Sequence, residues 1–179
     1  GRSRIRRLMK IMGIEALCSK PSTSTPSPAH KKHPYLLRNV EVTEVDQVWC
    51  TDITYIPMPH GHCYLVAIMD WHSRAVLAWE VSNSMDTGFC LRTLQRAFER
   101  TGRKPKVFNT DQGSQFTSPE WVETIEENGI KVSMDGKGRW MDNVFIERLW
   151  RSVKYEKLRL WSYETVGEAS ELVSDWMEF

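Results

Sequence analysis

The stretch "KVFNTDQGSQFTSPEWVETIEENG", residues 106–129, contains a short apolar strand, an acid and a well-marked helix. Ser118 is suited to cap the helix, Pro119 to occupy its first position, and Glu120 to place an acid in its first turn. Asp111 falls where the strand ends and a loop begins, and loops of this kind commonly carry functional groups. The stretch therefore predicts a strand–loop–helix unit with a functional acid at its centre.

Other β-forming and helical patterns surround this unit. The runs "VWCTDITYI", "HCYLVAIMD" and "SRAVLAWEV" follow one another closely and predict an antiparallel three-stranded meander. Apolar spacing predicts a helix over residues 86–100 and a long last helix from about Asp142 to about Leu160, with the short strand "IKV" before it. A further helix is expected at the start, in "RSRIRRLMKIMG", and "ELVSDWMEF" ends inside a helix. From the meander to the last long helix the predicted order is three strands, helix, strand, helix, strand, helix.

The composition is that of a globular protein with one domain and a tail. The chain has 179 residues, of which 41% are hydrophobic. It has no apolar run near the ~18 residues that a membrane span needs, and its first residues lack a signal peptide, so we expect an intracellular protein without a membrane partner. Four scattered cysteines lack paired spacing, which favours reduced thiols over disulfides or a zinc ribbon.

The charge of the chain is unevenly distributed. Residues 1–40 carry nine Lys or Arg against Glu15 alone, a net charge of +8, so the remainder carries −7 of the total of +1. Within this part, "KPSTSTPSPAHKKHP" lacks apolar periodicity and predicts an extended linker. A basic arm on an acidic body favours contact with a polyanion, and the alternative is a solvated tail.

Three acids can be brought together by the predicted order of elements. Asp52 lies inside the first strand, where an unpaired carboxylate is costly to bury and needs a metal, a cationic partner or solvent. Glu147 lies in the last helix, within about 40° of Arg151 and Lys154 on one face. A separate stripe of the same helix is apolar: Ile146, Leu149, Val153 and Leu160. The helix therefore has one face for packing and another that presents an acid beside two cations.

Carboxylates from Asp52, Asp111 and Glu147 that converge on one point would repel one another unless a cation neutralised them. Hard oxygen ligands suit Mg²⁺ or Mn²⁺. Two such ions about 4 Å apart can activate an attacking oxygen and stabilise the leaving oxygen of a phosphodiester. The three acids therefore predict metal-dependent phosphoryl transfer.

The segments "WCTDITYI", "NTDQGSQFTS" and "DNVFIERLWRSVKYE" resemble the three acidic signatures of insertion-sequence transposases that have a retroviral-integrase-like catalytic core. Between Asp111 and Glu147 lie 35 residues, the interval typical of that family. Lys154 stands where the family has a DNA-contacting lysine. The resemblance spans roughly residues 34–179, and "RIRRLMKIMGIEAL" is similar to the last helix of the family's N-terminal DNA-binding region.

The resemblance implies an α/β, ribonuclease-H-like fold with a mixed five-stranded sheet flanked by helices. It implies metal-dependent DNA strand cleavage and strand transfer, with Asp52, Asp111 and Glu147 as catalytic residues and ligands of two Mg²⁺ or Mn²⁺ ions. The expected partners are element-end and target DNA and further copies of the chain assembled on it, in a bacterial-type cytoplasm at the nucleoid. Contacts with DNA are expected at Lys154, Arg151, Arg148, Arg6, Arg7, Lys31 and Lys32.

The expected organisation has three parts. Residues 1–18 form the end of a truncated DNA-binding helical region, residues 19–40 a basic linker rich in Pro and Ser, and residues 41–179 a catalytic core truncated at its C-terminal end. Gln112 replaces an Arg found in many members, and "MDGKGRWMDN" replaces a loop usually rich in Ser and Gly. The alternatives are a truncated non-catalytic DNA-binding remnant, which metal-dependent nicking would exclude, and a cellular ribonuclease H, which would cleave RNA–DNA hybrids.

Other conspicuous side chains favour structural roles. His60 and His62, with Cys63 and Cys50, fit no zinc-finger spacing, and a turn explains the two histidines. The tryptophans near the last helix favour packing over stacking on splayed bases: Trp140, Trp150 and Trp161.

Overall fold

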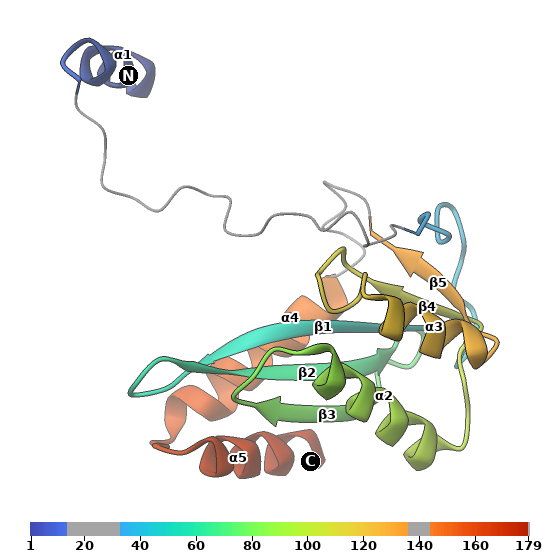
Figure 1. Cartoon of the computed structure of the whole chain (residues 1–179). Helices are drawn as coiled ribbons and strands as arrows, with labels where there is room; N and C mark the ends of the chain where they lie inside the picture. The colour runs from blue at the N-terminus through green and yellow to red at the C-terminus, as the bar shows by residue number, and fades with distance from the viewer. Residues whose placement is uncertain (14–32, 136–143, 179) are drawn as a thin grey trace.

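The computed structural model describes residues 1–13, 33–135 and 144–178, apart from the side chains of Arg2 and Arg6. Five strands form one sheet in the order β3-β2-β1-β4-β5 (Figure 1). The strands are β1 (Val48–Pro57), β2 (His62–Asp70), β3 (Val76–Ser82), β4 (Val107–Thr110) and β5 (Lys131–Met134). The α-helices are α1 (Arg2–Ile11), α2 (Thr87–Thr101), α3 (Pro119–Glu127), α4 (Val144–Ser152) and α5 (Val166–Glu178).

The sheet is mixed. Strands β1, β2 and β3 pair antiparallel, as the predicted meander requires, whereas β1, β4 and β5 pair in parallel. The chain reaches β4 through α2 and β5 through α3, because parallel neighbours need crossover connections. The α/β class and the mixed five-stranded sheet flanked by helices are confirmed.

Each face of the sheet is covered by its own helices. Alternation along β1 sends Trp49 and Ile53 toward α2 and α3, and Val48 and Cys50 toward α4 and α5. The first core is completed by buried residues of α2 and α3: Phe89, Cys90, Leu94, Ala97, Trp121, Val122 and Ile125. The second is completed by buried residues of the C-terminal helical region: Ile146, Leu149, Trp150, Val153, Leu158, Ala169 and Val173. The central strand β1 therefore lies between two apolar layers.

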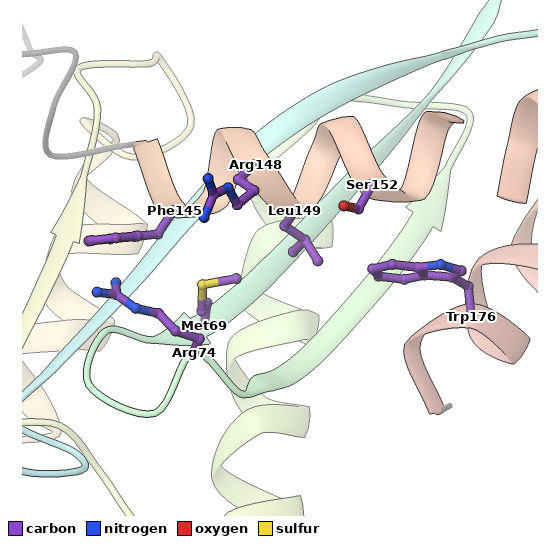
Figure 2. Close-up of a pocket in the computed structure, with 7 residues that line it drawn as sticks. All are labelled: Met69, Arg74, Phe145, Arg148, Leu149, Ser152 and Trp176. Carbon is purple, nitrogen blue, oxygen red and sulfur yellow. The ribbon is translucent and has the colours of Figure 1, made fainter. Parts of the chain in front are cut away.

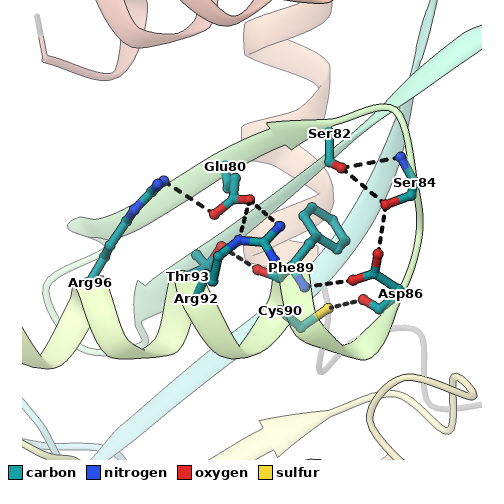
Figure 3. Close-up of polar contacts among 9 residues, drawn as sticks. All are labelled: Glu80, Ser82, Ser84, Asp86, Phe89, Cys90, Arg92, Thr93 and Arg96. Carbon is teal, nitrogen blue, oxygen red and sulfur yellow. Dashed lines mark hydrogen bonds and ion pairs between the residues drawn. The ribbon is translucent and has the colours of Figure 1, made fainter.

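Helix α2 is regular and its two ends are satisfied. Asp86 accepts a hydrogen bond from the Phe89 backbone N–H at 2.8 Å, and Gly102 ends the helix in the left-handed conformation at φ +63°. Glu80 of β3 binds Arg92 and Arg96 of the helix (Figure 3). Because both arginines are about half exposed, these pairs add little stability, and the cap and the buried face hold the helix in place.

The last long helix differs from its prediction. After α4, the chain continues as one π-helical turn, η2 (Val153–Lys157), and one 3₁₀ turn, η3 (Leu158–Leu160). Leu160 was expected on the apolar stripe but is 71% exposed, and Leu158 is buried in its place. A π turn closes i→i+5 hydrogen bonds, so it shifts the phase of every side chain that follows. The expectation for Leu160 was wrong because it assumed an unbroken α-helical period.

Two further features complete the described fold. The Leu36 backbone N–H donates to Ser133 Oγ of β5 at 3.1 Å and Leu37 is buried, so the chain already packs on the sheet before residue 40. Helix α5 contains most of "ELVSDWMEF" and packs through Ala169 and Val173. In the described part of the chain, no helix combines the length and the apolar character that a membrane span needs.

Candidate active site

The register of two parallel strands positions the first two acids. Strand β1 pairs with β4 only from Val48 to Cys50, which lie opposite Val107 to Asn109. Continuing the same offset by two residues places Asp52 opposite Asp111, just beyond the end of β4. Neighbouring strands lie about 4.8 Å apart, and ligand sites in such sheets form where strands leave one another at their carboxyl ends. The fold therefore brings these two carboxylates together at the carboxyl end of β4.

Asp52 is held by a side chain from α4. The indole Nε1 of Trp150 donates a hydrogen bond to Asp52 Oδ2 at 2.9 Å. Burial raises the pKa of Asp52, and the negative charges of Asp111 and Glu147 raise it further, while the bond from Trp150 opposes the rise. The ionised form of Asp52 is therefore unfavourable unless a cation binds beside it.

Asp111 is held by its own loop. The Gly113 backbone N–H donates to Asp111 Oδ1 at 2.8 Å, and burial raises the pKa of this carboxyl as well. A Cβ at position 113 would lie 2.9 Å from Asp111 Oδ1, closer than real Cβ contacts, so any other residue there would force the carboxylate to shift. The amide of Gln112 donates to the backbone carbonyl of Asp135 at 2.8 Å and ties the loop to the end of β5.

Lys154 brings a cation to the same side of β1. Its Nζ donates to Thr54 Oγ1 at 2.6 Å, and Thr54, two residues after Asp52, points to the same face of the strand. Burial lowers the pKa of Lys154 and the charge of Asp52 opposes that change. Lys154 thus lies within electrostatic reach of Asp52.

Glu147 lies farther out. It is exposed in the first turn of α4, although its charge acts on Asp52. Over residues 1–13, 33–135 and 144–178, no three His, Cys, Asp or Glu side chains are close enough together to hold a metal ion. The structure therefore brings Asp52 and Asp111 together, places Lys154 beside Thr54, and leaves Glu147 exposed at the start of α4.

The remaining predicted DNA contacts are scattered. Arg151 is exposed on α4, and Arg7 is exposed on α1. Arg148 instead lines a cavity of about 270 Å³ together with Arg74, whose guanidinium carbon lies 3.0 Å from the centre of the Phe145 ring (Figure 2). The side chain of Arg6 and the residues Lys31 and Lys32 lie outside the described part of the chain.

Several residues of the site were not predicted. Thr54 could have been found by strand alternation, because it shares a face with Asp52. Gly113 could have been suspected as a glycine two residues after a strand-end acid. Trp150 was predicted to pack, and it is buried, but its hydrogen bond to Asp52 depends on how α4 docks on β1. Trp161, also expected to pack, is 59% exposed.

Comparison with known proteins shows the family to which the chain belongs. Residues 42–139 match the family model of the integrase core domain. The chain is 30% identical to the transposase for insertion sequence element IS904 of Lactococcus lactis subsp. lactis, over 98% of this chain and 71% of that protein. It is 26% identical to the transposase for insertion sequence element IS629 of Shigella sonnei, over 99% of this chain and 61% of that protein.

Among solved structures, the HTLV-2 integrase catalytic core domain in complex with magnesium superposes with a TM-score of 0.51 at 24% identity. The superposition covers 61% of this chain and 67% of that one. Together with the sheet order, it defines the class of the fold as ribonuclease-H-like. The chain belongs to the integrase core family and, within it, to the insertion-sequence transposases. It spans less than two thirds of the length of the Shigella sonnei relative.

Proposed function

We propose that this chain carries out the DNA strand cleavage and strand transfer of a transposition reaction at Asp52, Asp111 and Glu147. The observation that carries the proposal is the register of β1 and β4, which sets Asp52 opposite Asp111. Both carboxyls have a raised pKa because they are buried, and Asp52 also feels the charge of Asp111. Two partly desolvated carboxyls that face each other at the end of β4 are suited to bind a cation.

The donor set fits a divalent metal. Asp52, Asp111 and Glu147 offer the hard carboxylate oxygens that Mg²⁺ and Mn²⁺ prefer, and these three residues would hold one or two ions. When bound, such ions activate the attacking oxygen and stabilise the leaving oxygen of a phosphodiester. Because Glu147 is exposed at the start of α4, it can complete the site by a change of rotamer or a small shift of the helix.

The protein residues divide the remaining work. Trp150 fixes the orientation of the Asp52 carboxylate, and the Gly113 N–H fixes that of Asp111. The ammonium of Lys154 contacts a phosphate next to the scissile bond and positions it for in-line attack. The oxygen of water or of a DNA 3′-hydroxyl forms the new bond to phosphorus as the bond to the leaving 3′ oxygen breaks. No covalent enzyme intermediate is needed.

We further propose that the basic arm strengthens binding to element-end and target DNA, that copies of the chain assemble on that DNA, and that the protein resides at the bacterial nucleoid. In this scheme residues 1–18 belong to a DNA-binding region, 19–40 to a linker and 41–179 to the core. Deleting residues 1–32 spares the buried Leu37 and removes most of the +8 charge of residues 1–40. The slope of log affinity against log salt should then fall by about 0.9 for each phosphate that the arm no longer neutralises. An unchanged slope would show a solvated tail.

The direct test uses labelled oligonucleotides that carry candidate element ends. With Mg²⁺ or Mn²⁺ the chain should produce nicked strands and joined products, and chelation with EDTA should abolish both. Glu123→Gln, on the exposed face of α3, is the matched control for loss of a carboxylate and should leave the products unchanged. Absence of nicks with every end sequence and both metals would contradict the proposal.

A further inference from the structure

Aromatic and cationic side chains cluster after α4, and all of them except the partly buried Lys157 are exposed. We call it the aromatic–cationic patch and define it by Tyr155, Lys157, Arg159 and Trp161. Tyr155 is 53% exposed and Trp161 is 59% exposed. The guanidinium carbon of Arg159 lies 4.0 Å from the centre of the Tyr155 ring, and Lys157 Nζ lies 5.3 Å from that of Trp161. Flat, polarisable groups beside positive charge are therefore presented to solvent.

The break in helical period creates this patch. The π turn η2 and the 3₁₀ turn η3 rotate the chain so that Leu158 enters the core while Leu160 and Trp161 face outward. An exposed tryptophan beside an exposed leucine contributes nothing to the core of this chain. Single π turns are frequent at functional sites, because they re-aim side chains at a cost in helix geometry.

A groove of about 310 Å³ lies beside the patch. It is lined by Pro57, Lys154, Tyr155, Leu158, Arg159 and Tyr163. The Tyr163 hydroxyl donates to the carbonyl of Pro57 at 3.0 Å, so two of the lining residues are joined by a hydrogen bond. The volume is at the lower end of the range for small-molecule pockets, about 300–1,000 Å³. Lys154 belongs both to this groove and, through Thr54, to the surroundings of Asp52.

We infer that the groove holds an unpaired nucleobase of the DNA strand that leads to the scissile phosphate. The inference rests on the proposed function and adds a subsite to it. Aromatic rings and arginine planes are the groups on which splayed bases stack, and lysine neutralises the adjoining phosphate. In the described chain, no carboxylate forms an ion pair with Lys154 or Arg159, whereas Lys157 lies 3.5 Å from Asp175. The groove therefore offers a polyanion two cations that form no ion pair within the described chain, although the charge of Asp52 also acts on Lys154.

The test compares two DNA probes with the full chain in EDTA, so that no cleavage occurs. One is a flush duplex, and the other is the same duplex with a short single-stranded overhang that carries 2-aminopurine. The wild type should prefer the overhang probe and quench the fluorescence of its 2-aminopurine. Tyr155→Ala and Arg159→Ala should each weaken overhang binding by about 5- to 150-fold, the range measured for loss of a stacked base, and should abolish the quench.

Control variants separate stacking from charge and from folding. Tyr155→Phe keeps the ring and should retain the quench, whereas Arg159→Lys keeps the charge but loses the plane and should retain flush-duplex binding alone. Tyr55→Ala removes a tyrosine of similar exposure, 51%, from the opposite face of β1 and should change neither probe.

The possible results are distinct. Unchanged overhang affinity in both alanine variants would overturn the inference. If the alanine variants instead lost a dimer in sedimentation while their DNA affinity stayed intact, the inference would also be overturned, and the patch would be assigned to contact with a second copy. Wild-type binding with unaffected variants leaves the proposed function standing and rejects the groove alone. Failure of the wild type to bind either duplex contradicts both.

Discussion

Helix α2 and the region from α4 through η2 to η3 both pack on the sheet, but they are built differently. In α2 the period is unbroken from Thr87 to Thr101, and Asp86 and Gly102 satisfy its two ends. In the second region the period changes at Val153 and again at Leu158. The region with the broken period also carries Glu147 and the side chains that contact Asp52 and Thr54.

The difference separates support from chemistry. Substitutions in α2 should change the free energy of unfolding and leave reaction steps alone, because its polar contacts stay within the helix and its cap or reach Glu80 and Trp79 of β3. Substitutions near α4 should change reaction steps more than stability. Variants of the two regions test this division, and the expected loss of activity decreases from the acids to α2.

The largest effect is expected at the acids themselves. Asp52→Asn, Asp111→Asn and Glu147→Gln should each lower metal-dependent cleavage by more than about 100-fold, since loss even of an outer partner of a metal ligand costs about 10- to 100-fold. Gel quantification of nicked product measures this. A variant that retained full cleavage would remove its acid from the proposed site.

The same variants also have a stability signature. Because the folded pKa of Asp111 lies above its ordinary value of 3.8, the folded state favours the protonated carboxyl. Its contribution to stability is present below that value and is lost as the pH rises through the raised folded pKa. At neutral pH, Asp111→Asn should therefore unfold at a higher temperature than the wild type. If Asp111→Asn instead lowered both the unfolding temperature and the cleavage rate, the variant would be misfolded, and its loss of cleavage would not report on the site.

An intermediate effect is expected at Gly113. In Gly113→Ala the new Cβ would meet Asp111 Oδ1 at 2.9 Å and displace the carboxylate, so cleavage should fall about 10- to 100-fold. Gly167→Ala is the matched control, because the nearest atom to its Cβ is 3.8 Å away and alanine is favoured over glycine in a helix by about 1 kcal/mol. Single-turnover rates of the two variants should differ, and equal rates would show that the close approach has no effect.

A smaller effect is expected at Trp150. Trp150→Phe keeps a buried ring but removes the donor 2.9 Å from Asp52 Oδ2, and cleavage should fall about 10-fold. Because the lost bond favoured the ionised form of Asp52, its pKa should rise further, and the acidic limb of the pH–rate profile should move to higher pH. A lower rate with an unmoved profile would indicate that Trp150 only packs.

The smallest effect on activity is expected in α2. Asp86→Ala removes the cap of the helix and should cost about 1 kcal/mol of stability, while cleavage per folded molecule stays unchanged. Hydrogen bonds from Ser84 and Phe89 lower the pKa of Asp86, so the stability that its charge provides is lost as the pH falls through that lowered value. Urea unfolding at several pH values measures both. A drop in the cleavage rate per folded molecule of Asp86→Ala would show that α2 also affects the reaction, which contradicts the division.

Most of the fold could be predicted from local signals. The strands of the meander follow from runs of β-forming residues, and the helix of the unit around Asp111 follows from its cap at Ser118. The phase of the last helix could not be predicted, because no local sequence pattern marked the π turn. The turn accompanies the burial of both Val153 and Leu158, which depends on tertiary packing.

The acids of the site were predicted from the sequence, but the hydrogen bonds that side chains donate to them and to Thr54 were not. Asp52 was conspicuous because an acid in the middle of a strand is rare, and Asp111 because it ends one. The bond from Trp150 to Asp52 and that from Lys154 to Thr54 join residues 98 and 100 positions apart, so they depend on tertiary docking that no local pattern contains.

The offset that sets Asp52 opposite Asp111 has a consequence for the evolution of the gene. Side chains alternate along a strand, so a single inserted or deleted codon between Cys50 and Asp52 would turn the aspartate to the α2 face and move it out of line with Asp111. A codon change within the same stretch keeps both face and alignment. Mobile copies of this element should therefore tolerate conservative substitutions at β1 positions other than Asp52, whereas indels there should mark copies that have lost the ability to move.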